Sequence, residues 1–353
     1  MDFASRIIKW YGENKRDLPW RETRDPYKIW LSEIILQQTR VEQGLSYYID
    51  FIKSFPTVQS LAKATEDKIM KKWQGLGYYS RARNLHKTAK IIVSDYNGIF
   101  PNDFFILKKF KGIGDYTAAA ISSFAFNKPN AVVDGNVLRV ISRIFGIKQA
   151  VDIPKTKNKI YTIVSELISQ KEPGLFNQAI MEFGAIQCTI NNPKCDDCCM
   201  NNFCYAYSKN MVDQLPAKKK KSLVKDRFLN YLVVNFHKNN RNYIYIRKRT
   251  ESDIWKNLYD FPCIETKVQK NPDELLSSSE WKSFFIKTKP IIKSVSGIIK
   301  HKLTHQTLYV YFYEVLIKSP IKNIPKNVKP ILKNDIKKYA VPRLIDKYIH
   351  IKQ

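Results

Sequence analysis

The sequence predicts a multidomain chain in which an all-α domain over residues 1–207 is followed by an α+β domain over residues 228–353. Three observations support this prediction. The chain has 353 residues, which is enough for two domains of roughly 150 residues each. Apolar residues recur at helical spacing in the first part, and strand-like patterns replace them in the second. A proline and a run of four lysines fall between the two parts, which predicts a basic linker over residues 208–227.

The first domain is predicted as an array of helices. Apolar side chains recur three or four residues apart in the segments 30–35 and 137–144. Short breaks at Pro56, Gly98 and Pro129 separate such segments. In the second domain, residues 231–234 and 243–246 are rich in Tyr, Val and Ile, and residues 308–317 form a third run of this kind, which predicts strands.

The charge of the chain points to a polyanionic partner. Sixty Lys and Arg residues against 32 Asp and Glu residues give a net charge of +28, and phosphates are the usual partner of such an excess. The lysine-rich composition is also what an AT-rich genome encodes, so charge alone does not decide the question. The sequence has no long apolar span and no signal-peptide pattern, so we expect a cytoplasmic, nucleoid-associated bacterial protein.

Four cysteines lie within 17 residues: Cys188, Cys195, Cys198 and Cys204. Thiolates this close together can bind one compact metal centre, which a chain without an export signal favours over disulfides. Zinc sites with four cysteines normally contain two C-x-x-C pairs, and here there is one. The spacing therefore favours a [4Fe–4S] cluster, with zinc as the alternative.

A hairpin between two helices is predicted at residues 112–114. The first helix should end at Gly112 and the second should begin after Gly114. Two glycines allow a tight turn whose backbone N–H groups can bind a DNA phosphate at a helix N-terminus. The same Gly-x-Gly pattern also occurs in ordinary tight connections between helices.

Further segments occur along the chain in a recognisable order: DLPWR (17–21), WLSEIILQQT (30–39), GLGYYSRARNL (75–85), VDGNV (133–137) and FNQA (176–179). Together with the hairpin and the cysteines, they make residues 1–207 resemble the endonuclease III-like superfamily of helix-hairpin-helix DNA glycosylases, and most closely its adenine DNA glycosylase (MutY) family. Residues 228–353 resemble the Nudix-like domain of that family through WKNLYDFP (255–262) and KHKLTH (300–305). The glutamate-rich helix of nucleotide hydrolases is missing from this sequence, so recognition is the expected role of the second domain.

The resemblance implies a monofunctional DNA repair glycosylase that hydrolyses the N-glycosidic bond of adenine mispaired with 8-oxoguanine or, less efficiently, with guanine. It implies one [4Fe–4S] cluster on the four cysteines, with Cys199 standing where the family usually has proline. The expected partner is double-stranded DNA that contains these mispairs, and the chain is expected to act as a monomer.

Two carboxylates are the candidate catalytic groups. Glu33 is bracketed by Leu31, Ile34 and Ile35, and such a setting raises the pKa of a carboxyl group, so Glu33 would protonate N7 of adenine. Its alternative is a glutamate on the solvent side of an amphipathic helix. Asp134 precedes a helical run, so it is predicted to be an N-cap; the resemblance also makes it the stabiliser of the charge on the sugar, or a transient nucleophile.

Tyr116 decides the expected reaction outcome. Related lyases have a lysine at this position of the hairpin motif, whose amine forms a Schiff base with the sugar. A phenol cannot do this, so we expect an abasic site as product and a Tyr116 hydrogen bond near Asp134. A tyrosine that only packs in the core is the alternative.

The resemblance assigns the remaining contacts to DNA. Gln38 and Tyr78 would wedge into the duplex, and Gly112 and Gly114 would contact the DNA backbone. Six residues would surround the extruded adenine or its sugar: Arg16, Trp20, Arg21, Leu36, Asn136 and Gln178. Trp20 and Leu36 are equally typical of a core. Leu303, Thr304 and His305 occupy the place of the Phe-Ser-His loop that senses 8-oxoguanine, so we expect the preference for that lesion to survive.

Two alternative functions stay open at this point. One is an endonuclease III-type glycosylase and lyase for oxidised pyrimidines, which Tyr116 and the second domain disfavour. The other is a non-catalytic iron–sulfur protein that binds DNA or senses redox state, which the intact Glu33, Asp134 and Tyr116 disfavour.

Overall fold

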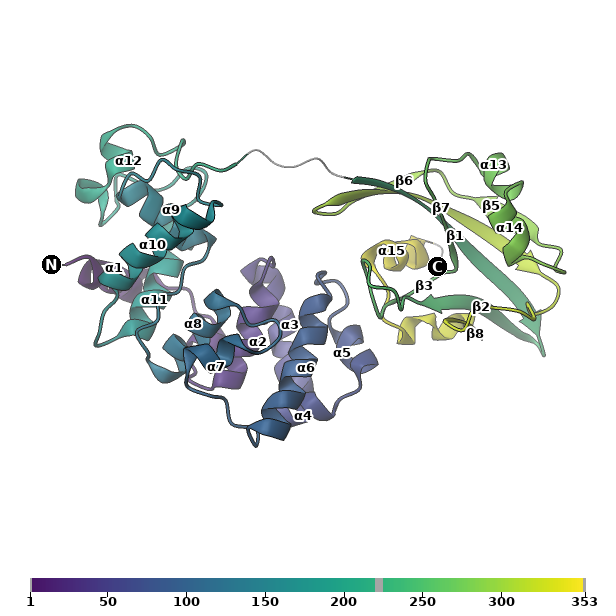
Figure 1. Ribbon diagram of the computed structural model, residues 1–353, viewed down its shortest axis with the longest axis horizontal. Helices are drawn as coiled ribbons and strands as arrows, with labels where there is room; N and C mark the ends of the chain where they lie inside the picture. The colour runs from purple at the N-terminus through teal and green to yellow at the C-terminus, as the bar shows by residue number, and fades with distance from the viewer. Residues whose placement is uncertain (1, 220–224, 352–353) are drawn as a thin grey trace. The chain divides into compact units, whose positions relative to one another are not determined.

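The computed structural model describes residues 2–219 and 225–351 (Figure 1). The chain forms two compact units: Met1–Ala64 with Arg83–Lys221, and Thr65–Ala82 with Ser222–Gln353. The first is helical and the second contains a mixed sheet, which confirms the predicted fold class. Residues 220–224 of the predicted linker lie outside the described residues.

The helices of the first unit include two that contain the predicted apolar segments 30–35 and 137–144. In chain order, the helices of this unit are α1 (Phe3–Asn14), α2 (Pro26–Leu36), α3 (Val41–Ser54), α4 (Val58–Lys63), α6 (Ser80–Asp95), α7 (Phe104–Lys108), α8 (Asp115–Phe126), α9 (Gly135–Ile144), α10 (Pro154–Leu167), α11 (Pro173–Glu182) and α12 (Tyr205–Ser208). The helix α6 begins in the second unit and continues into the first. A core of buried side chains, including Ile7, Val140, Ile160 and Ile180, joins α1, α9, α10 and α11.

Neighbouring residues explain where two helices of the first unit, α2 and α8, begin. The side chain of Asp25 accepts a hydrogen bond from the backbone of Tyr27 (2.9 Å), and Pro26 follows it at the first position of α2. The helix α8 begins directly after Gly114, and Gly112 before it has a φ of +85°. A Cβ at Gly112 would lie 2.8 Å from the Cβ of Asn84. Glycine is therefore required at this turn on both conformational and steric grounds.

The second unit is built around one sheet with helices on both faces. Its strands are β1 (Lys225–Lys238), β2 (Arg241–Lys248), β3 (Tyr259–Asp260), β4 (Cys263–Thr266), β5 (Ile291–Val295), β6 (Ile299–Lys302), β7 (Gln306–Ile317) and β8 (Val328–Leu332). The order is β3-β2-β1-β7-β5, with β4 beside β1, β6 beside β7 and β8 beside β2. The strands β1 and β7 run parallel, from Lys225 opposite Gln306 to Phe236 opposite Ile317.

Each face of the sheet packs against different helices. Leu344 and Ile345 of α15 (Arg343–Ile351) belong to one buried cluster. Leu275 of α13 (Pro272–Leu276) and Trp281 of α14 (Ser279–Phe284) belong to the other. Because both faces are covered by helices, the long strands carry apolar side chains on both sides.

Residues 65–82, which the sequence analysis grouped with the helical domain, pack in the second unit. They include α5 (Glu66–Lys72). Lys71 Nζ donates to the carbonyl oxygen of Tyr339 (3.2 Å), and Gln74 Nε2 donates to Asp346 Oδ1 (2.8 Å). These contacts join segments that are more than 260 residues apart, so no local sequence pattern could predict them.

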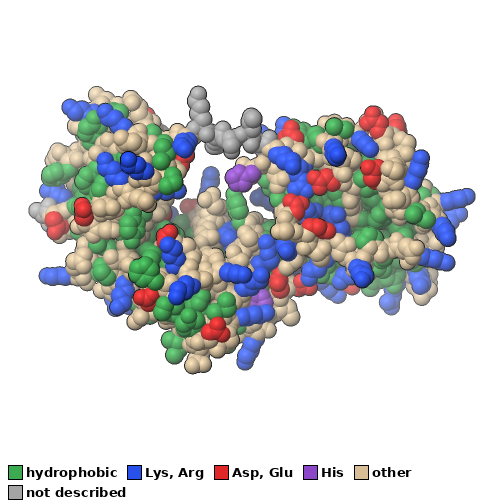
Figure 2. Space-filling model, in the orientation of Figure 1, with side chains coloured by type: hydrophobic (Ala, Val, Ile, Leu, Met, Phe, Trp, Pro, Cys, Tyr) green, Lys and Arg blue, Asp and Glu red, His purple; other side chains and the backbone are tan. Residues whose placement is uncertain are grey.

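Lysine and arginine side chains are spread over the visible surface of each unit (Figure 2). The positive charge is thus carried at the surface, where it can meet phosphates. Among the described helices, none has the length and apolar character needed to cross a membrane.

Candidate active site

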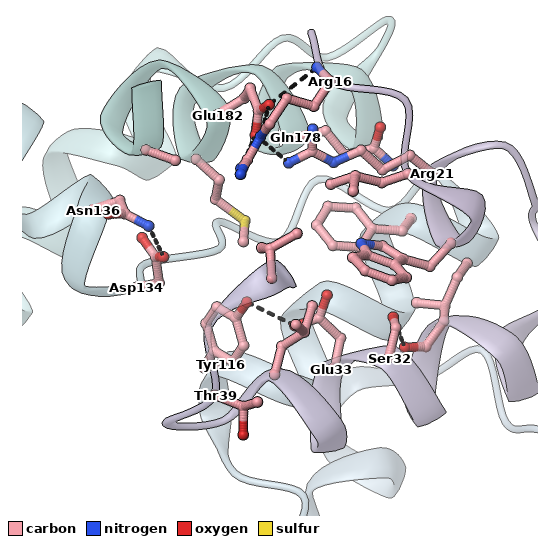
Figure 3. Close-up of a pocket in the computed structure, with 18 residues that line it drawn as sticks. Arg16, Arg21, Ser32, Glu33, Thr39, Tyr116, Asp134, Asn136, Gln178 and Glu182 are labelled. Atoms are coloured by element: carbon pink, nitrogen blue, oxygen red, sulfur yellow. Dashed lines mark hydrogen bonds and ion pairs between the residues drawn. The ribbon is translucent and has the colours of Figure 1, made fainter. Parts of the chain in front are cut away.

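A cavity of about 190 Å³ lies in the first unit between α2, α8, α11 and the start of α9 (Figure 3). Nine of the residues singled out in the sequence line it: Arg16, Trp20, Arg21, Glu33, Leu36, Tyr116, Asp134, Asn136 and Gln178. Glu33 and Asp134, which are 101 positions apart, therefore share one cavity. This is the arrangement that the two-carboxylate interpretation requires.

Glu33 is a buried carboxyl group in the middle of α2. Only 6% of the residue is exposed, so it does not lie on a solvent-facing side of the helix. Burial raises its pKa from 4.5 to about 7; the hydrogen bond from Tyr116 opposes this rise, and the charge of Asp134 adds to it. A large fraction of Glu33 is therefore protonated at neutral pH, as a general acid requires.

Tyr116 donates from its hydroxyl to Glu33 Oε2 over 2.7 Å. The sequence predicts a hydrogen bond of this hydroxyl near Asp134, and the observed bond goes to the other carboxyl group, that of Glu33. Burial raises the pKa of Tyr116 well above 10, so the phenol keeps its proton and remains a donor. Because Oε2 of Glu33 accepts this bond, the carboxyl proton is left to Oε1.

Asp134 caps α9, as the sequence predicts. Its Oδ1 accepts from the backbone of Val137 (2.8 Å) and its Oδ2 accepts from Asn136 Nδ2 (2.8 Å). Burial raises the pKa of Asp134 above 3.8, and these two hydrogen bonds oppose the rise. The bonds hold the carboxylate in place and help it stay ionised, so it can face a developing positive charge.

Arg139 connects the Asp134 cap to the cysteine loop. Its Nη2 donates to Asn136 Oδ1 (2.9 Å), and its Nε donates to the carbonyl oxygen of Cys188 (2.7 Å). Asn136 in turn holds Asp134. Four residues thus form a continuous chain of hydrogen bonds between the cavity and the loop.

Sequence reasoning missed Glu182, which binds two arginines at the cavity wall. Its Oε1 accepts from Arg16 Nε (2.7 Å) and its Oε2 from Arg21 Nη2 (2.6 Å). Hydrogen bonds and charge from these arginines outweigh burial and lower the pKa of Glu182 to about 2. One available signal was that Glu182 follows Gln178 by four residues, which places both on one side of α11.

Arg21 keeps one donor free for a ligand. Its Nη1 is buried and has no hydrogen-bond partner among the described residues, whereas its Nη2 is held by Glu182. A buried donor without a partner is costly. Since Arg21 lines the cavity, an acceptor atom on a bound base would satisfy Nη1.

The predicted wedge and lesion-sensing residues lie outside this cavity. Gln38, with a φ of +58°, lines an adjoining groove together with Glu33 and Asp134. In the second unit, the exposed Tyr78 forms a 2.5 Å hydrogen bond between its hydroxyl and Thr304 Oγ1. Leu303, Thr304 and His305 form the tight turn between β6 and β7, closed by Leu303 N donating to the carbonyl of Gln306 (2.8 Å).

The hairpin glycines lie at the start of α8. A Cβ at Gly114 would meet no atom within 4 Å, so the backbone there faces open space. Such a helix N-terminus can receive a phosphate oxygen.

The four clustered cysteines line one small cavity, and Cys199 is not among its lining residues. Arg143 Nη1 donates to Cys188 Sγ over 3.4 Å. Burial raises the pKa of Cys198 to about 12, so thiolates here need a compensating cation, which an iron–sulfur cluster supplies. No group of three or more His, Cys, Asp or Glu side chains in the described part of the chain is arranged to hold a metal ion. Four cysteine side chains on one cavity, beside an arginine, are nevertheless the donor set that an iron–sulfur cluster takes.

Comparisons with known proteins agree with this architecture. Residues 31–170 match the family described as "HhH-GPD superfamily base excision DNA repair protein", and residues 233–350 match the NUDIX domain. The structure of a thermostable thymine-DNA glycosylase is similar with a TM-score of 0.55 and 32% identity, over 59% of this chain and 95% of that one. An endonuclease III–DNA complex, with a TM-score of 0.51 and 22% identity over 59% and 94%, shares the fold. Fold and cavity together define a base excision DNA glycosylase, an enzyme that acts on N-glycosidic bonds.

Sequence relatives specify the family. The adenine DNA glycosylase of Buchnera aphidicola from Schizaphis graminum is 35% identical over 99% of this chain and 98% of its own length. The adenine DNA glycosylase of Buchnera aphidicola subsp. Baizongia pistaciae is 36% identical over 87% of this chain and 84% of its own length. The adenine DNA glycosylase of Arabidopsis thaliana is 35% identical over 73% of this chain and 46% of its own length. The chain belongs to the adenine DNA glycosylase family.

Proposed function

We propose that this enzyme, acting as a monomer, removes adenine paired with 8-oxoguanine in double-stranded DNA, and removes it less efficiently when it is paired with guanine. The observation that carries the proposal is the shared cavity of Glu33 and Asp134. Burial raises the pKa of both carboxyl groups, to about 7 for Glu33, and the N-cap hydrogen bonds of Asp134 oppose the rise there and favour its ionised form. Two carboxyl groups of opposite protonation are what hydrolysis of a glycosidic bond needs.

The cavity offers both stacking surfaces and polar contacts to an extruded base. Trp20 and Leu36 supply apolar area. The free Nη1 of Arg21 can donate to a ring nitrogen of adenine. Gln178, whose Oε1 accepts from the hydroxyl of Tyr11 (3.2 Å), adds an amide group. Extrusion costs a few kcal/mol, and contacts of this kind offset it.

Hydrolysis then follows from the two carboxyl groups. Glu33 gives its proton to N7 of adenine, the bond between C1′ and N9 breaks, and the electron pair leaves with the base. Asp134 stabilises the positive charge on the sugar. Water adds to C1′, and its released proton restores the acid form of Glu33. Tyr116 has no amine for a Schiff base, so the product is an abasic site on an intact strand.

Two further features belong to the proposal. The thiolates of Cys188, Cys195, Cys198 and Cys204 would bind one [4Fe–4S] cluster, which would cross-link the loop 188–204. In the second unit, the hydroxyl of Thr304 and the imidazole of His305 would contact the 8-oxoguanine, and Tyr78 would enter the duplex beside it. The Leu303 side chain replaces an aromatic ring at this loop.

Single-turnover excision tests the proposal directly. Among duplexes that carry A:8-oxoguanine, A:G, T:G or thymine glycol, the first two should release adenine, fastest opposite 8-oxoguanine, and the last two should not release thymine or thymine glycol. The T:G duplex probes the activity named for the thymine-DNA glycosylase of similar structure. Strand cleavage without alkali or heat would contradict the monofunctional assignment. Excision of thymine or of thymine glycol in preference to adenine would overturn the substrate assignment.

A matched pair of variants tests the chemistry. Glu33→Gln should lower the excision rate by about 10²–10⁴-fold, the usual contribution of a general acid, while DNA affinity stays nearly unchanged. Glu166→Gln is the control, because this glutamate is exposed on α10 and does not line the cavity. If Glu33→Gln released adenine at the normal rate, the mechanism would be wrong.

A further inference from the structure

The catalytic cavity opens into a second, larger space. This groove has a volume of about 880 Å³ and shares Glu33, Leu36, Tyr116 and Asp134 with the cavity. Its outer wall comes from α7 and α10. Because the groove adjoins Glu33 and Asp134 and greatly exceeds the inner cavity in volume, it has room for more of a DNA strand than the extruded base.

Two aromatic side chains on the outer wall are exposed to solvent. Phe105 of α7 is 72% exposed and Tyr161 of α10 is 40% exposed. Their chain neighbours are anchored: Phe104 packs against the Ala119, Ala120 and Val132 cluster, and Ile160 is fully buried. The ring of Phe105 meets that of Phe104 edge to face at 5.3 Å. Burial of the neighbours thus fixes both helices while the two exposed rings line the groove.

One lysine accompanies these rings, and three acidic residues line the same groove: Glu33, Asp115 and Asp134. Lys157, one helical turn before Tyr161 on α10, lines the same groove. Gly135 at the start of α9 lines it as well, but the Asp134 carboxylate already caps that helix, which leaves Lys157 as the phosphate contact. Exposed aromatic rings beside basic groups are typical of surfaces that bind unpaired nucleotides, because every base has a face on which a ring can stack.

We propose that Phe105 and Tyr161 form a contact site for the nucleotides that flank the extruded one in the same DNA strand. The proposal rests on the proposed function, because it takes the groove as the path of that strand. Extrusion breaks stacking on both sides of the target. The rings replace part of the lost contact by packing on the deoxyribose and base, and Lys157 binds the neighbouring phosphate. Such a site is indifferent to sequence.

The test measures binding of the full chain to a duplex that contains one tetrahydrofuran abasic analogue. This ligand already has a distorted strand and no target base, so its binding does not depend on which base the enzyme excises. Phe105→Ala and Tyr161→Ala should each raise the Kd about tenfold, as expected for one lost aromatic contact. Ile99→Ala is the control, because Ile99 is also 72% exposed and lies outside the groove.

Salt dependence separates the two kinds of contact. Lys157→Ala should reduce the slope of log K against log salt by about one, whereas Phe105→Ala and Tyr161→Ala should leave the slope unchanged. Unchanged melting temperatures would show that the variants fold. Kd values within twofold of the parent for both aromatic variants, or equal weakening by Ile99→Ala, would overturn the proposal. Failure of the parent chain to excise adenine would overturn the proposed function and leave this binding test intact.

Discussion

Glu33 and Glu182 lie on two walls of one cavity, and they differ in charge. Both side chains are buried. The pKa of Glu33 is raised to about 7, and that of Glu182 is lowered to about 2. Glu33 receives one hydrogen bond from a neutral phenol, whereas Glu182 receives bonds from two guanidinium groups.

The comparison shows that burial alone does not determine whether a carboxyl group is charged. Burial disfavours the ionised form of both residues, and only Glu182 has cations close enough to reverse that effect. Two buried glutamates on one cavity therefore differ in protonation. Burial favours the protonated form of Glu33, and Glu182 is an anion that holds Arg16 and Arg21 at the cavity wall.

The largest expected effect is that Glu182→Gln and Glu33→Gln change the free energy of unfolding at pH 7 in opposite directions. Glu182→Gln should lower the free energy of unfolding of the first unit by about 3 kcal/mol, because it leaves two partly buried cations without their partner. Glu33→Gln should raise it by about 3 kcal/mol, because it removes the cost of a carboxyl group whose pKa is raised from 4.5 to about 7. Urea unfolding followed by helical circular dichroism measures both. A loss of stability in Glu33→Gln would contradict the comparison.

Glu33 and Glu182 should change the free energy of unfolding in different pH ranges. Glu33 binds its proton more tightly in the folded state, so its contribution is complete below pH 4.5 and is lost between pH 4.5 and 7. Glu182 binds its proton less tightly when folded, so its contribution is complete above pH 4.5 and is lost as the pH falls toward 2. The difference in the free energy of unfolding between the parent and Glu33→Gln should therefore vanish below pH 4.5. The difference for Glu182→Gln should vanish near pH 2.

Local sequence patterns predict the N-cap at Asp134 and a buried or a solvent-facing setting for Glu33, but they do not predict the partners of Glu33 and Glu182. Glu33 lies among apolar residues in one helix, and Asp134 directly precedes another, so each environment is visible within a few residues. Glu182 depends on Arg16 and Arg21, which are more than 160 positions away. The bond from Tyr116 to Glu33 spans 83 positions. Such contacts are set by helix packing, and nothing near Tyr116 in the chain distinguishes one carboxyl partner from the other.

The two domains also show that sequence patterns predict local structure but not contacts between distant segments. Helical and strand periodicity predicted the class of each unit, because both patterns are local. The packing of residues 65–82 in the second unit was not predicted, because Gln74 reaches Asp346 across 272 positions. The four cysteines could be grouped from spacing alone, since all lie within one short loop.

The excision rate should fall on the alkaline side of neutrality. A general acid acts only while protonated, so the single-turnover rate should decline tenfold per pH unit above about pH 7, the pKa of Glu33. On the acidic side the rate should fall as Asp134 becomes protonated, at a pH above 3.8 because burial raises its pKa. A profile measured from about pH 5 to about pH 9 checks this prediction, and a flat profile would be incompatible with Glu33 as the acid.

The smallest expected effect comes from the hydroxyl of Tyr116, which donates a hydrogen bond to Glu33. The hydrogen bond from Tyr116 lowers the pKa of Glu33 and thereby opposes burial. Tyr116→Phe removes this hydrogen bond, so the pKa of Glu33 should rise and the alkaline limb of the excision profile should move to higher pH. Near about pH 6 the rate should change only a few-fold, because Glu33 is mostly protonated in both proteins. Tyr11→Phe is the matched control, since Tyr11 donates to Gln178 in the same cavity and not to Glu33. A limb that moved to lower pH, or moved equally in both variants, would show that Tyr116 does not tune the acid.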